Sequence, residues 1–113
     1  MVVTGIEIRE DVDSFIYSEF FESIFFNVKN NNYEVSCSKE QYDRFLKVLF
    51  DQTKQFVEMN NGTVINLNKV KYVNTTEIDS FAKIIFEDKI FLAENRTLRG
   101  MIKVSEIIDR LEH

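Results

Sequence analysis

Cysteine and histidine, two residue types that often carry nucleophilic and acid–base chemistry, occur once each in this sequence. Cys37 is the only cysteine, and it stands just before an expected helix start at Lys39, where the helix dipole favours a thiolate. Cys37 also closes an alternating pattern with Tyr33 and Val35, which is typical of a buried structural cysteine. The only histidine is His113, which belongs to a Leu-Glu-His ending typical of a cloning vector. We therefore expect no histidine to act as a base for the Cys37 thiol. We expect Cys37 to be structural.

Two acidic pairs could suggest metal binding or acid–base catalysis. Asp11 and Asp13 stand where a helix is expected to begin, and Glu87 and Asp88 stand in an expected hairpin turn. Both pairs are therefore interpreted as solvated surface. Neither has the spaced carboxylates and central glycine of a calcium loop, and the chain has no glycine motif for phosphate binding. We expect a protein that is not an enzyme and that uses no metal or cofactor.

Five basic residues make up the one basic neighbourhood of the chain. Lys69 and Lys71 share one face of an expected strand, and Arg96, Arg99 and Lys103 recur at helical spacing. If the two faces adjoin, they form a surface for phosphate or nucleic acid, and the alternative is a solvated face balanced by neighbouring acidic residues. The net charge of −5 and the isoelectric point of about 4.9 repel nucleic-acid phosphate, so nucleic-acid binding is the disfavoured alternative.

Aromatic side chains gather near the amino terminus in greater number than one helix face can bury. The chain has eleven Phe and no Trp. The rings in question belong to Phe15, Tyr17, Phe20, Phe21 and Phe25. Either this segment is central to the core, or part of it is a contact surface, as exposed aromatic patches usually are. We expect an accessory or regulatory protein that acts through protein contacts, as a homodimer formed by this segment or by a sheet edge.

The clearest secondary-structure signal is a helix over 39–54. Ser38 and Gln41 form a capping box before it, and apolar residues then follow at helical spacing. A helix is also expected over 11–23, because acidic first-turn residues precede apolar residues at similar spacing. Residues 18–26 fit either a continuing helix or a buried strand, and we expect a strand to follow the helix there.

Alternating apolar residues and Asn-rich turns predict a series of strands. Gly5 is expected to form a bulge in the first strand, and segments 30–32 and 60–62 are expected to form turns. The expected strands cover residues 1–8, 24–28, 33–37, 56–59, 64–67, 70–73, 81–86 and 90–93. A closing helix is expected over 98–111, weakened by Gly100.

These elements predict an α+β fold. Five to seven mostly antiparallel strands form a sheet, and two or three helices pack on one of its faces. The order hairpin, polar cap, amphipathic helix occurs over 23–50 and again over 83–108, which is either a degenerate duplication or a common supersecondary pattern. We expect one domain over 1–110, because the chain has 113 residues and its Leu-Glu-His ending is typical of a cloning vector.

Composition and hydrophobic patterning indicate where in the cell the protein is expected. Hydrophobic residues make up 44% of the chain, and no apolar run approaches the length that crosses a membrane. The sequence shows no export signal and a single cysteine, so we expect a cytoplasmic protein with no membrane role. Abundant Asn, Ile and Lys indicate an AT-rich, bacterial or phage-type source.

Residues 56–111 resemble small bacterial modules built as a β-meander followed by a helix. The resemblance rests on the Asn61-Gly62 turn, the runs INLNKVKYV at 65–73 and AKIIFEDK at 82–89, and the closing helix. Flagellar FlbD-like proteins and the opening half of LytTR DNA-binding domains are similar. LytTR domains continue into basic strands that are absent here, and FlbD-like proteins lack the amino-terminal half. The resemblance implies a non-enzymatic regulatory or accessory protein, and no functional residue is carried over from it.

Overall fold

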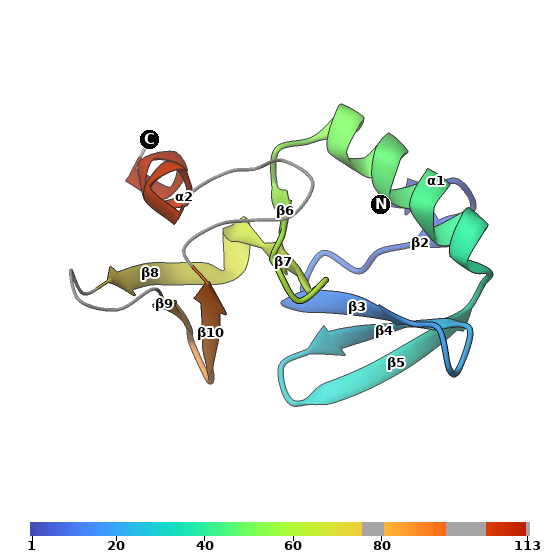
Figure 1. The fold of residues 1–113 in the computed structure, drawn as a ribbon, viewed down its shortest axis with the longest axis horizontal. Coiled ribbons are helices and arrows are strands. Elements are labelled where there is room, and N and C mark those ends of the chain that lie inside the picture. Colours follow the sequence, from blue (N-terminus) through green and yellow to red (C-terminus); the bar gives the residue numbers. More distant parts are fainter. Residues whose placement is uncertain (76–80, 95–103, 113) are drawn as a thin grey trace.

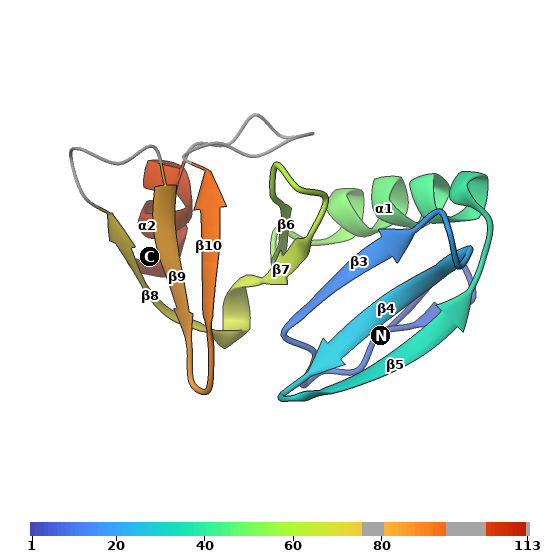
Figure 2. The same cartoon turned by 60° about the horizontal axis from the view of Figure 1, so that its bottom comes forward.

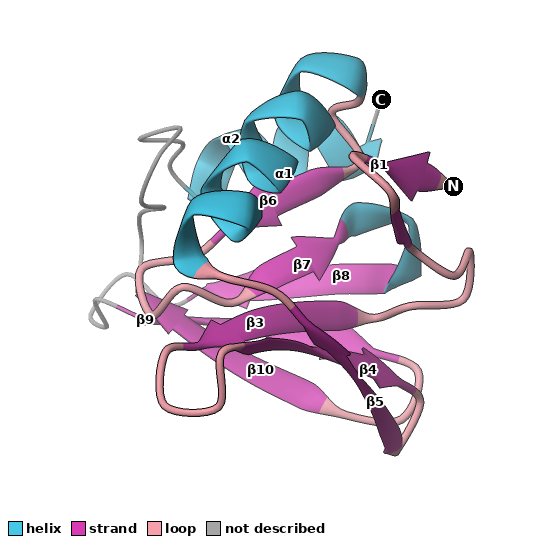
Figure 3. Cartoon of the chain, turned by 90° about the vertical axis from the view of Figure 1, so that its right-hand side faces the viewer, coloured by secondary structure: helices cyan, strands magenta, loops and turns pink. Residues whose placement is uncertain are grey.

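The computed structural model describes residues 1–75, 81–94 and 104–112 as an α+β fold with both helices on the same side of the strands (Figures 1 and 3). The helices are α1 (Lys39–Gln52) and α2 (Val104–Glu112). The strands are β1 (Val2–Val3), β2 (Ile6–Glu7), β3 (Ser14–Ser18), β4 (Ser23–Val28), β5 (Asn31–Ser36), β6 (Phe56–Glu58), β7 (Val64–Asn66), β8 (Val70–Thr75), β9 (Phe81–Phe86) and β10 (Ile90–Glu94).

The strands are divided among three antiparallel sheets. The largest has five strands in the order β5-β4-β3-β7-β6, a second has three in the order β10-β9-β8, and β1 pairs with β2 alone. The expected α+β class with mostly antiparallel strands is therefore confirmed, and its largest sheet has the five strands expected at the lower bound. The difference is that the carboxy-terminal strands form a sheet of their own, tilted against the first (Figure 2).

The helix expected over 11–23 is wrong, because this segment forms strand β3 and a turn. Phe15 lies opposite Phe26 of β4, with ring centroids 5.1 Å apart, and it is 1% exposed. Ile16, the next residue, faces outward. The apolar spacing at the start of the segment fits the period of a helix as well as that of a strand. Pairing with β4 and β7 stabilises the strand, a conformation that suits aromatic and β-branched residues.

Gly5 forms a turn where a bulge was expected. Val3 pairs with Ile6, so Thr4 and Gly5 are the two turn residues, with φ angles of 49° and 83°. Both angles lie in the left-handed region, as they do in the two-residue hairpin turns that match the twist of the strands. The expected single strand over 1–8 is therefore a small hairpin.

Helix α1 and its capping box are confirmed. The Ser38 Oγ accepts a hydrogen bond from the Gln41 backbone N–H at 3.2 Å, and the Ser38 N–H donates to the Gln41 side-chain oxygen at 2.8 Å. The helix ends at Gln52, two residues before the expected end. Its buried face places Phe45 and Leu49 against the five-stranded sheet.

The hairpin β6–β7 is the wall shared by two hydrophobic clusters. Phe56 and Val64 belong to the cluster under α1, whereas Val57 and Ile65 belong to the cluster beneath α2 and the three-stranded sheet. Every residue of both strands is buried, which explains why each strand has two adjacent apolar residues, although each also holds one buried polar residue, Glu58 or Asn66. The two sheets therefore pack as one body about this hairpin.

Asp13 joins the two sheets and is buried, so its expected place on the solvated surface is wrong. Its carboxylate pairs with the Lys89 ammonium at 2.8 Å and accepts the Lys29 backbone N–H at 2.8 Å. Lys89 also donates to the Lys29 carbonyl oxygen at 2.8 Å and to the Asn27 side-chain oxygen. The turn between β9 and β10 is thereby fastened to the ends of β3 and β4. The start of the expected closing helix lies outside the described residues.

Candidate protein-contact surface and the pocket beside it

The helix-free side of the five-stranded sheet carries an exposed apolar surface, which we name the aromatic tip: Ile16, Phe20, Phe21 and Phe25. Phe20 is 88% and Phe21 61% exposed. Ile16 lies opposite Phe25 on adjacent strands, and both face away from the helices. Figure 2 shows this side of the sheet turned toward the viewer, with α1 behind it.

The turn that carries the tip is held by hydrogen bonds. The Ser18 hydroxyl accepts the Phe21 backbone N–H at 3.3 Å, and the Ser23 hydroxyl donates to the Phe21 carbonyl oxygen at 3.0 Å. The Glu22 carbonyl accepts the Cys37 N–H at 3.0 Å. The rings of Phe20 and Phe21 meet edge to face with centroids 4.8 Å apart. The exposed rings therefore belong to a defined surface.

The five aromatic residues singled out in the sequence do not act as one group. Phe15 is core, and Tyr17 is half-buried with its ring stacked on Tyr42. Phe20, Phe21 and Phe25 remain at the surface, where the ring centroids of Phe21 and Phe25 are 5.7 Å apart. The segment is thus divided between core and exposed surface, and a contact through the exposed part stays a prediction.

A second apolar surface, which sequence reasoning missed, lies on the outer face of the three-stranded sheet. Tyr72, Ile85 and Ile90 stand in one row across β8, β9 and β10. Tyr72 is 57%, Ile90 61% and Leu92 62% exposed. The alternation of Ile90 and Leu92 with the half-buried Phe91 was the available signal, and only the position of α2 shows which face is open.

The basic neighbourhood is described only in part. Lys71 is exposed at an irregularity of β8 between Val70 and Tyr72. Lys69 belongs to a short 3-10 turn, Leu67–Lys69, so the expectation that it shares a strand face with Lys71 is wrong. Asn66 causes this turn, because its side-chain oxygen accepts the Asn68 backbone N–H at 3.0 Å. Arg96, Arg99 and Lys103 lie outside the described residues, and a nucleic-acid surface stays a prediction.

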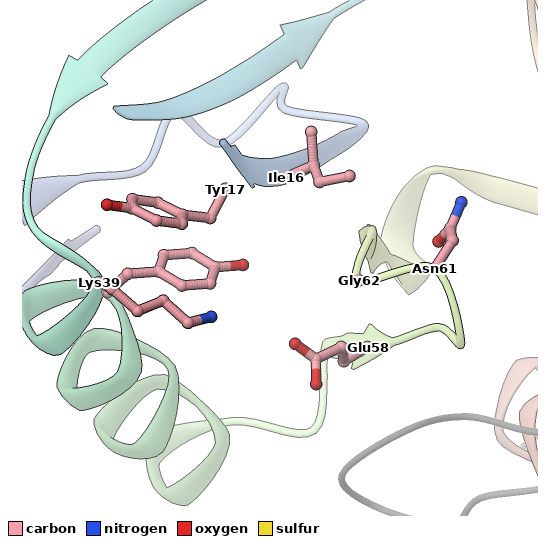
Figure 4. A pocket seen from close by; sticks show the side chains of 7 residues that line it. Ile16, Tyr17, Lys39, Glu58, Asn61 and Gly62 are labelled. Atoms are coloured by element: carbon pink, nitrogen blue, oxygen red, sulfur yellow. The ribbon is translucent and has the colours of Figure 1, made fainter. Parts of the chain in front are cut away.

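A pocket of about 420 Å³ opens beside the tip, where β3 and β7 part (Figure 4). β3 pairs with β7 only at Ser14 and Phe15, so Ile16 and Tyr17 have no β7 partner. The β6–β7 turn bends away there through Gly62, whose φ of 89° is a conformation suited to glycine. The pocket is lined by Ile16, Tyr17, Lys39, Tyr42, Glu58, Asn61 and Gly62.

The pocket combines a stacked aromatic wall with two opposite charges. The rings of Tyr17 and Tyr42 are 4.8 Å apart and nearly parallel. The Lys39 ammonium lies 5.5 and 5.4 Å from their centroids, and the Glu58 carboxylate faces the same space from β6 (Figure 4). Burial raises the pKa of Tyr17, whose hydroxyl donates to the Cys37 carbonyl oxygen at 2.9 Å.

Cys37 is half-buried at the end of β5, beside a groove of about 560 Å³ that also includes Arg44. Burial raises the pKa of its thiol above the ordinary 9.0, which opposes formation of the thiolate near neutral pH. Across the described ranges, no cluster of three or more His, Cys, Asp or Glu side chains is placed to hold a metal ion. Nor is any helix there long and apolar enough to span a bilayer.

No family model, curated protein or solved structure matches this chain. The resemblance of residues 56–111 to β-meander-plus-helix modules therefore stays a prediction. The order of strands that these modules share is compatible with the described strands β6 to β10, over residues 56–94.

Proposed function

We propose that this chain is a small non-enzymatic accessory protein that acts through protein contacts and associates with itself as a homodimer. The aromatic tip is the contact surface. The observation that carries the proposal is an exposed pair, Phe20 and Phe21, set on a hydrogen-bonded turn. Exposing two phenylalanine rings to water is unfavourable, and such patches characteristically mark surfaces that a partner covers.

The surroundings of the tip favour a protein partner. Phe20 and Phe21 project from a turn flanked by Glu19 and Glu22, so an apolar centre is rimmed by charge. Interfaces share this plan, since aromatic anchors fill the centre and polar groups surround it. The acidic rim and the net charge of −5 disfavour a nucleic acid at this surface.

The mass in solution tests the homodimer. Light scattering across a range of concentrations is expected to give a dimer for the native chain and a monomer for the double variant Phe20→Ser, Phe21→Ser. Because both rings are exposed, the double variant is expected to change the free energy of unfolding by less than about 1 kcal/mol.

The matched control is Leu92→Ser, which removes an equally exposed apolar side chain from the other sheet. It is expected to leave the dimer intact. A native chain that stays monomeric at every concentration would overturn the homodimer, and a double variant that stays dimeric would remove the tip from the interface.

A further inference from the structure

We propose that the pocket between β3, α1 and the β6–β7 turn binds a small zwitterion, an α-amino acid with an apolar side chain. The inference rests on the pocket and its charges, and it is independent of the proposed homodimer. The ammonium group of the ligand meets Glu58, its carboxylate meets Lys39, and its side chain lies against the tyrosine stack.

The size and walls of the pocket suit such a ligand. Its volume of about 420 Å³ falls within the range of roughly 300 to 1,000 Å³ that small-molecule sites occupy. The stacked rings of Tyr17 and Tyr42 supply apolar surface on one side. Three separate segments of the chain form the walls, and the stacked rings, 4.8 Å apart, give one wall a fixed shape.

The two charges decide the class of ligand. Glu58 is only 7% exposed, and its carboxylate faces the pocket opposite the Lys39 ammonium (Figure 4). A simple anion would meet the repulsion of Glu58, and a simple cation would meet that of Lys39. A ligand that carries both charges on neighbouring atoms is attracted by both residues. Charge complementarity therefore selects the zwitterion over either singly charged relative.

Lys39 can turn toward a ligand at little cost. Its ion pair with Asp43 spans 3.5 Å, and the two side chains are 49% and 45% exposed. Surface pairs of this kind contribute little to stability, because solvent screens them. The backbone of Lys39 is fixed in the first turn of α1, so the ammonium stays within reach of the pocket.

Three probes that share one phenyl group test the charge argument. L-phenylalanine, phenethylamine and 3-phenylpropionate are titrated into the ¹⁵N-labelled chain, and the amide signals of Ile16, Asn61 and Gly62 are followed by NMR. L-phenylalanine is expected to shift these signals, and each singly charged probe is expected to bind about tenfold more weakly or worse, since each loses one charge-assisted contact. No shift with L-phenylalanine at its solubility limit, or equal binding of phenethylamine, overturns the proposal.

Two variants assign the charges. Lys39→Met is expected to weaken L-phenylalanine binding at least about tenfold and to leave phenethylamine no weaker. Glu58→Gln is expected to weaken phenylalanine binding by a similar factor. Because Glu58 is buried, its substitution could unfold the chain, and in that case the exposed variant Lys39→Met still tests the site. Lys47→Met, an exposed change on α1 outside the pocket, is the matched control and is expected to have no effect. Unchanged phenylalanine binding by Lys39→Met would overturn the site.

Discussion

At the residue scale, a single buried carboxylate links the two sheets. The Asp13 side chain is 8% exposed and pairs with Lys89, whose side chain is 26% exposed. The same carboxylate accepts the Lys29 backbone N–H. A buried charge is costly unless it is paired and hydrogen-bonded, and Asp13 satisfies both conditions. Removal of one partner leaves the other charge in a poorly solvated place.

Asp13→Asn is expected to lower the free energy of unfolding by about 3 kcal/mol, because Lys89 loses its counter-charge in a partly buried position. Urea denaturation measures the change. Asp11→Asn is the control, since the Asp11 pair with Arg9 is exposed at 39% and 57% and should matter by less than about 1 kcal/mol. Equal effects of the two variants would contradict the role assigned to Asp13.

At the element scale, local capping fixes where α1 begins. Ser38 and Gln41 exchange hydrogen bonds, which satisfies two donors that the first turn of a helix would leave without partners. The buried face of α1 then covers the five-stranded sheet, and its first turn brings Lys39 to the pocket. Capping thus links local sequence to the position of a side chain in the candidate site.

Ser38→Ala is expected to destabilise the chain by about 1 kcal/mol, as the loss of an N-cap usually does. Urea denaturation gives the stability, and the far-ultraviolet circular dichroism checks the helix content. Ser36→Ala, an exposed change in the neighbouring strand β5, serves as the comparison and is expected to be nearly neutral. A Ser38→Ala variant as stable as the native chain would show that packing alone fixes α1.

At the scale of the whole molecule, the Cys37 thiol and the hydroxyls of Tyr17 and Tyr33 make the free energy of unfolding depend on pH in the alkaline range. Burial raises the pKa of Cys37 above 9.0 and, as the largest cause, that of Tyr17 and Tyr33 above 10.0. The unfolded chain therefore loses these protons at lower pH than the folded chain. Because the unfolded state then binds fewer protons, the free energy of unfolding falls as pH rises.

We expect full stability from these groups below about pH 9 and a progressive loss above it, as pH passes first the ordinary and then the raised pKa values. Urea denaturation at several alkaline pH values measures the slope. Cys37→Ala removes one titrating group, and its slope is expected to be shallower than that of the native chain just above pH 9. A stability that rises with alkali would contradict the direction of all three shifts.

The sequence by itself determined the features that local chemistry controls. Helix α1 with its Ser38 cap, the two strands of the hairpin β4–β5 and the turn at Gly62 follow from capping, alternation and backbone freedom, which act within a few residues. The turn expected at 30–32 is wrong, because Asn31 and Asn32 pair with Val28 and Asn27 in the strands and the turn is Lys29–Asn30. The α+β class with antiparallel strands followed from the same signals. For the aromatic tip, the sequence indicated only the segment that contains it, since its aromatic residues outnumber what one face can bury. Which rings are exposed did not follow from the sequence.

Tertiary structure decided what depends on distant partners. Pairing with β4 and β7 made Ser14–Ser18 a strand, since its apolar spacing suits a helix as well. Packing chose Phe15 for the core and left Phe20 and Phe21 outside. The pocket arises because β3 and β7 separate beneath α1, which brings Lys39 and Glu58 together. No local sequence pattern predicts that Lys39 and Glu58 line one pocket, because this depends on the relative positions of β3, α1 and the β6–β7 hairpin.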